Sequence, residues 1–74
     1  MEGFAPRLLA LRQRRGWSRA KLATTAGLHP MHLEKLETGK RTGVTGDTLI
    51  KLATALTTTS DYLLGLRADP TPYQ

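Results

Sequence analysis

The sequence contains no cysteine, and it has no hydrophobic run long enough to cross a bilayer. Without cysteine there can be no disulfide bond and no thiolate metal site, and a reducing compartment is favoured. The first residues show no signal-peptide pattern, so we expect a cytoplasmic protein that does not associate with membranes. A chain of 74 residues is long enough for one domain but not for a second hydrophobic core.

A recognisable catalytic arrangement is also missing. The sequence shows no nucleophile paired with a base, no glycine-rich phosphate loop and no carboxylate pair in a plausible pocket. His29 and His32 are spaced for one helix face, but no third ligand accompanies them, so we expect no metal and no other cofactor. The chain is therefore not predicted to be an enzyme.

Basic residues outnumber acidic ones. The chain has 11 Lys and Arg residues against 6 Asp and Glu residues, which gives a net charge of +5. This charge attracts polyanions, nucleic acid first and a membrane surface or an acidic protein second. Net charge alone does not distinguish these partners, because what matters is where the cations lie on the predicted helices.

Apolar residues recur with helical spacing in five segments, and no segment alternates as a strand would. We expect helices from about Ala5 to Arg15, from Arg19 to Ala26, from Pro30 to Glu37, from Thr45 to Leu56 and between Thr59 and Gly65. Ser, Thr and Asp residues favour helix N-caps, which makes Ser18, Thr45 and Thr59 the expected caps. The prediction is an all-α, compact five-helix bundle over residues 1–66, followed by a flexible tail over residues 67–74.

The segment from Ser18 to Gly39 carries the functional prediction. It reads as two short helices joined by a tight turn at Gly27-Leu28. The apolar residues that are spaced to pack these helices against each other are Leu22, Ala23, Leu28, Leu33 and Leu36. A compact helical pair of this kind can present its second helix to the major groove of DNA.

Several short motifs extend this pattern along the chain. They are L-x-x-L-R at Leu8–Arg12, Gly16, L-A at Leu22-Ala23, A-G-L at Ala26–Leu28, E-x-G-K-R at Glu37–Arg41, T-L-x-K-L-A at Thr48–Ala53 and D-Y-L-L-G at Asp61–Gly65. In this order the sequence resembles the phage-repressor and Cro (XRE) family of helix-turn-helix transcription regulators from about Phe4 to Gly65. The resemblance implies a lambda-repressor-like domain that binds double-stranded DNA sequence-specifically, with the helix of about Pro30–Glu37 in the major groove, and that acts like a repressor.

The resemblance also implies roles for individual residues. The expected base contacts are His29, Pro30, Met31 and Lys35. The expected phosphate contacts are Ser18, Arg19, His32, Thr38, Lys40 and Arg41. Arg12 and Glu37 are expected to form a structural ion pair. Three alternatives remain open at this point, because His29 can serve only as a helix cap, Pro30 only as a determinant of shape, and His32 only as solvated surface.

Charge and exposure support parts of this assignment. Arg19 and Lys21 lie in the first turn of their predicted helix, where cations oppose the helix dipole unless a phosphate binds there. Met31 is an apolar residue with no core position, and it can lie against a thymine methyl group. The alternative interpretations are a solvated basic face for the two cations and a surface gap-filler for Met31.

The sequence departs from the family pattern at several positions. Arg19 stands where glutamine is usual, and His29 stands where serine or threonine usually caps the recognition helix. Thr57 and Thr58 replace the usual Gly-Val, and the loop before the fourth helix is one residue longer than is common. Trp17 replaces a leucine between the first two helices, where we expect it to pack against the core and not to stack on a base.

We expect the partners to be double-stranded DNA and a second copy of the chain. The dimer would form either in solution or only on DNA, through the fifth helix and its flanks at Tyr62, Leu63 and Leu66. The alternative function is an antitoxin or another protein-interaction module on the same fold, with a toxin as its protein partner.

Overall fold

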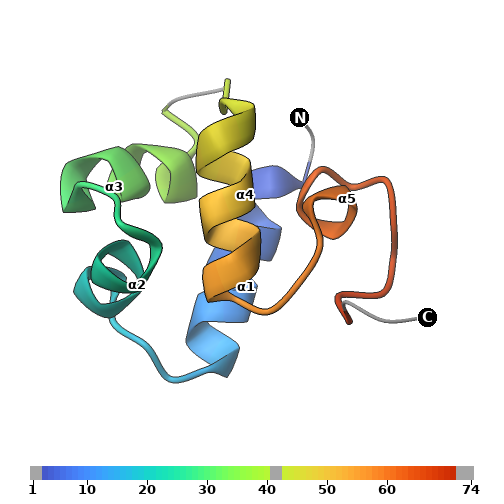
Figure 1. Ribbon diagram of the computed structural model, residues 1–74, viewed down its shortest axis with the longest axis horizontal. Helices are drawn as coiled ribbons and strands as arrows, with labels where there is room; N and C mark the ends of the chain where they lie inside the picture. Colours follow the sequence, from blue (N-terminus) through green and yellow to red (C-terminus); the bar gives the residue numbers. More distant parts are fainter. Residues whose placement is uncertain (1–2, 41–42, 72–74) are drawn as a thin grey trace.

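The computed structural model describes residues 3–40 and 43–71, and these residues form five α-helices and no strand. The helices are α1 (Phe4–Arg14), α2 (Arg19–Ala26), α3 (Pro30–Thr38), α4 (Gly46–Ala55) and α5 (Ser60–Leu63), as Figure 1 shows. The predicted all-α, five-helix fold is confirmed. The helix boundaries differ from the prediction by about one residue, as is usual at helix ends that fray.

The predicted N-caps are confirmed by their hydrogen bonds. Ser18, Thr45 and Thr59 each accept, through the side-chain hydroxyl, the backbone N–H of the third residue further along the chain. Each bond satisfies one of the N–H groups that a helix start leaves without a partner. At α3 the cap is His29, whose Nδ1 accepts the N–H of Met31 at 3.1 Å, and Pro30 occupies the first helical position.

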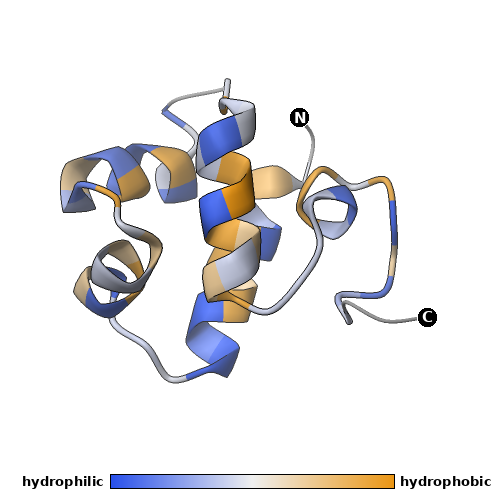
Figure 2. Ribbon diagram, in the orientation of Figure 1, coloured by the Kyte–Doolittle hydropathy of each residue, from blue (hydrophilic) through white to orange (hydrophobic). Residues whose placement is uncertain are grey.

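The core is built mainly from leucine, with Phe4 and three alanines. Seven leucines are fully buried, namely Leu8, Leu22, Leu33, Leu36, Leu52, Leu56 and Leu63. Figure 2 shows hydrophobic and hydrophilic segments alternating along α3 and α4, which is the pattern of helices with one buried face. Because burying one leucine contributes roughly 1.5–3 kcal/mol, these side chains contribute strongly to holding the five helices together.

The turn between α2 and α3 is set by Gly27. Its φ of 72° lies in the left-handed region, which glycine adopts without the strain that a Cβ would cause. The N–H of Leu28 then reaches the carbonyl oxygen of Ala23 at 2.8 Å, and the half-buried Leu28 side chain packs against the core. This geometry ends α2 and directs the chain into α3.

The segment after α5 has contacts with the bundle. One guanidinium nitrogen of Arg7 in α1 donates to the carbonyl oxygens of Tyr62 and Arg67, both at 2.8 Å. The hydroxyl of Thr58 donates to the carbonyl oxygen of Pro70 at 2.5 Å. The domain boundary at residue 66 and the flexibility of the tail stay predictions. Within the described ranges, every helix is too short or too polar to span a membrane.

Candidate nucleic-acid interface

The outward face of α3 carries the residues that the sequence assigns to base contacts. Met31 is 58% exposed and Lys35, one turn further along, is also exposed, whereas Leu33 and Leu36 hold the opposite face in the core. His29 and Pro30 are exposed at the start of the helix. An open hollow beside them is lined by Arg19, His29, Pro30, Met31 and Glu34. Folding therefore brings these side chains together on one surface.

Five of the six residues assigned to phosphate contacts lie within the described residues, on or beside α2 and α3. Ser18 caps α2, His32 is half-buried on α3, and Lys40 is exposed after the end of α3. The hydroxyl of Thr38 donates to the carbonyl oxygen of Glu34 at 2.9 Å, within its own helix. Arg41 lies outside the described residues.

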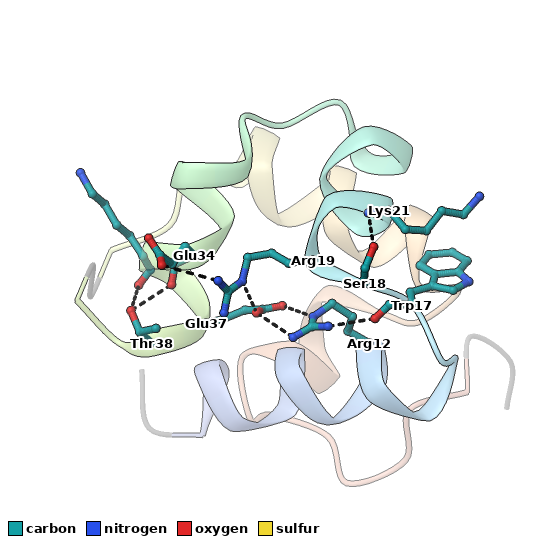
Figure 3. A network of polar contacts seen from close by, with 9 residues as sticks. Arg12, Trp17, Ser18, Arg19, Lys21, Glu34, Glu37 and Thr38 are labelled. Carbon is teal, nitrogen blue, oxygen red and sulfur yellow. Dashed lines mark hydrogen bonds and ion pairs between the residues drawn. The ribbon is translucent and has the colours of Figure 1, made fainter.

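A partly buried ion-pair network connects α1, α2 and α3 (Figure 3). Arg12 contacts both carboxylate oxygens of Glu37, with Nε to Oε2 at 2.6 Å and its second terminal nitrogen to Oε1 at 3.2 Å. Arg12 also donates to the carbonyl oxygen of Trp17 at 2.8 Å. The Glu37 side chain is only 1% exposed, so the network fixes the last turn of α3 against α1.

Arg19 joins the same network, which the sequence interpretation did not anticipate. Its Nε lies 3.0 Å from Glu37 Oε1, and one terminal nitrogen lies 3.5 Å from Glu34 Oε2. Glu34 was not among the predicted site residues, because phosphates were expected to repel it unless it turned to a cytosine amine. The three-residue spacing of Glu34 and Glu37 could have indicated the contact with Arg19 from the sequence, because it places both acids on one side of α3, where one cation can reach both.

Trp17 packs half-buried against the core, as predicted. The guanidinium carbon of Arg15 lies 5.3 Å from the centre of a Trp17 ring, and the ammonium nitrogen of Lys21 lies 5.7 Å from it. Both distances are within the range of cation–π attraction. Lys21 is thus partly engaged with the tryptophan and not only with solvent.

Among residues 3–40 and 43–71, no three His, Cys, Asp or Glu side chains are grouped as metal ligands would be. The arrangement offers instead an exposed helix face with hydrogen-bond donors, an apolar side chain and cations at its edges. Such a surface can contact the base edges and the backbone of a duplex.

Comparison with known proteins agrees with this geometry. A family model described as helix-turn-helix matches residues 8–63. The N-terminal DNA-binding domain of SinR from Bacillus subtilis matches with a TM-score of 0.80 and 26% identity, over 82% of this chain and 88% of that one. Structures of SinR in complex with DNA and with SinI give the same score and identity, and 97% and 59% of their chains are covered.

The restriction-modification controller protein C.AhdI from Aeromonas hydrophila matches with a TM-score of 0.77 and 36% identity, over 82% of this chain and 91% of that one. A search of curated proteins found no match. The family match spans all of α2, α3 and α4, most of α1 and the whole of α5. This chain therefore belongs to the helix-turn-helix family of the phage-repressor and Cro (XRE) type.

Proposed function

We propose that this protein binds double-stranded DNA sequence-specifically and regulates transcription as a cytoplasmic repressor, without enzymatic activity. The observation that carries the proposal is the outward face of α3, where Met31 and Lys35 are exposed while two leucines anchor the opposite face. SinR, which is similar to 82% of this chain, has been solved in complex with DNA.

In this proposal α3 enters the major groove, which is wide enough to admit a helix. Lys35 donates to guanine N7 or O6, and Met31 packs against a thymine methyl group. Because the Nδ1 of His29 accepts the Met31 N–H, a neutral His29 ring carries its proton on Nε2 and can donate to a base from there. Pro30 contributes the shape of the helix start.

Phosphate contacts on both sides of the groove come from Ser18, Arg19, His32, Thr38, Lys40 and Arg41. The first turns of α2 and α3 contain no acidic residue. Their N–H groups and positive dipole ends therefore support the binding of phosphate oxygens. These contacts orient α3, while the base contacts supply the sequence preference.

A salt titration of binding to duplex DNA tests the proposal. About five phosphate contacts predict a log–log slope of affinity against salt near −4 to −5. Lys40→Ala is expected to weaken binding to all sequences equally, and Met31→Ala is expected to change the preference among them. An affinity that does not respond to salt would contradict DNA binding, and equal losses on every sequence in both variants would remove Met31 as a base reader.

Binding as a homodimer to a palindrome, with half-sites about one helical turn apart, is part of the proposal. Leu66, which follows α5, is 75% exposed, and the neighbouring Tyr62 is half-buried. An exposed leucine at the end of the domain is a suitable start for an apolar contact between two copies. Sedimentation of the protein with and without DNA distinguishes a dimer in solution from one that forms only on the duplex.

A protein-interaction module, such as an antitoxin that binds a toxin, is the second candidate. One observation favours it, since Ile50 on α4 is 61% exposed and borders a hollow formed with Thr25, Ala26 and Thr54. SinR has been solved in complex with SinI, a second protein. A flat salt response in the titration above, together with an unchanged fold, would favour this candidate over DNA binding.

A further inference from the structure

Glu34 places a negative charge on the helix that is proposed to enter the groove. Its side chain is 46% exposed, and it lines the hollow beside Met31 and Pro30. An isolated carboxylate at this position would be repelled by the phosphates of a bound duplex. The charge is therefore compatible with DNA binding only if a cation compensates it or a base donates to it.

Arg19 provides the compensation and also fixes the position of the carboxylate. Its terminal nitrogen lies 3.5 Å from Glu34 Oε2, while its Nε is held at 3.0 Å by Glu37, which is itself buried against Arg12. The two arginines and the two glutamates sum to zero charge. Glu34 is thus the exposed end of a series of ion pairs that begins in α1. Because Arg19 already restricts its side chain, Glu34 loses less side-chain entropy when a ligand binds than an unpaired glutamate would.

The chemistry of a carboxylate limits what it can read. An ionised carboxylate only accepts hydrogen bonds, so it needs a donor on the base edge. The donors in the major groove are the N4 amine of cytosine and the N6 amine of adenine, but adenine also presents the N7 acceptor next to its amine. The acceptor N7 repels a carboxylate, whereas cytosine has no ring acceptor on that edge.

From this geometry we infer that Glu34 is a specificity-determining residue that accepts a hydrogen bond from the N4 amine of a cytosine, and that Arg19 is the residue that positions it. The inference rests on the proposed function, because it needs α3 in the major groove. It assigns a base to a residue outside the set of His29, Pro30, Met31 and Lys35.

Selection of bound duplexes from a random pool tests the inference, with the wild-type chain, Glu34→Gln and a matched control. The control is Asp61→Asn, which makes the same charge change at an exposed acid in α5, away from α3 in Figure 1. We expect the wild-type sites to contain a fixed cytosine with a preference of roughly 5- to 150-fold. Glutamine pairs with adenine N6 and N7, so the variant should prefer adenine at that position only. Asp61→Asn should leave the base preference at every position of the selected duplexes unchanged.

Arg19→Lys separates positioning from phosphate binding. Lysine keeps the positive charge but loses the planar fork that spans the two glutamates. The cytosine preference is therefore expected to fall while the salt slope stays the same. A preference equal to that of the wild type in Arg19→Lys would overturn the positioning role.

Two further outcomes would overturn the inference for Glu34. One is the same base preference at every position in the wild type and in Glu34→Gln. The other is tighter binding of Glu34→Gln to all duplexes alike, which would mean that Glu34 only holds Arg19 away from the phosphates. If the wild-type chain enriches no duplex at all, the proposed function fails and this inference fails with it. That result differs from the two outcomes above, in which the wild-type chain still selects duplexes.

Discussion

Replacing Glu37 with alanine is expected to destabilise the fold before it affects DNA binding. The Glu37 side chain is 1% exposed and Arg12 is 12% exposed, so removal of the acid leaves the Arg12 charge almost buried without a counter-ion. Removing one partner of a buried pair costs about 3–5 kcal/mol. Arg19 also loses Glu37, but its side chain is 38% exposed and can be rehydrated, so we expect a loss of about 3 kcal/mol, at the low end of that range.

The loss can be measured as a change in thermal and urea stability. In a domain of this size, 1 kcal/mol shifts Tm by about 4–8 °C, so a loss of about 3 kcal/mol lowers Tm by roughly 12–24 °C. Trp17 is the only tryptophan in the sequence and packs half-buried on the core, so its fluorescence reports the unfolding of the whole bundle. Circular dichroism of the helices gives the independent second probe that a two-state analysis needs.

The matched control is Glu34→Ala, which removes an acid from the same helix and from the same Arg19. That pair is exposed, and exposed pairs contribute about 0–1 kcal/mol, so Tm should change by only a few degrees. The double variant Arg12→Met with Glu37→Leu should lose less stability than Glu37→Ala, because no unpaired charge stays buried. An unchanged Tm in Glu37→Ala, or a loss equal to that of Glu34→Ala, would refute the reasoning.

Three smaller predictions follow from local geometry. Thr57 has a φ of 52°, a conformation that costs a residue with a branched Cβ about 1–2 kcal/mol, so Thr57→Gly should raise Tm by several degrees, and a lower Tm would contradict this. Ser18→Ala removes the α2 cap and should cost about 1 kcal/mol in urea unfolding, whereas no loss would mean that the cap is not formed in solution. Backbone and side-chain hydrogen bonds from Thr71 lower the pKa of Asp69. Thr71→Ala removes the hydroxyl donor and keeps the backbone N–H, so it should raise this pKa in an NMR titration without abolishing the whole shift. Because the folded-state pKa is lowered, any stability that Asp69 contributes is present above its unfolded pKa and is lost as the pH falls through the folded value.

Much of the fold could be predicted from the sequence because the signals are local. The spacing of Leu8 and Leu11, or of Leu33 and Leu36, reports a helix face within a few residues. Ser18, Thr45 and Thr59 indicate helix starts through bonds that span three residues. The exposure of Met31 also followed from these patterns, since the leucines of the same helix already defined its buried side.

The partners of Arg19 could not be predicted in this way. The sequence interpretation placed Arg19 against a phosphate, which stays a prediction, and gave it no acidic neighbour. The structure brings Arg19 to Glu37, which is 18 residues away in the sequence, and to Glu34, which lies on α3 together with Glu37. Such a contact depends on how α2 lies on α3, which is set by buried leucines from several helices and by the turn at Gly27.

The sequence by itself determined that the chain forms short amphipathic helices in a helix-turn-helix order, because hydrophobic period, caps and turn residues act over a few positions. The Arg12–Glu37 ion pair was expected from the family resemblance, but only the tertiary structure decided that Arg19 is paired with Glu34 and Glu37. An ion pair between distant residues exists only when packing brings the two side chains within a few ångströms, and Arg12, Arg19, Glu34 and Glu37 meet only once α1, α2 and α3 are in contact.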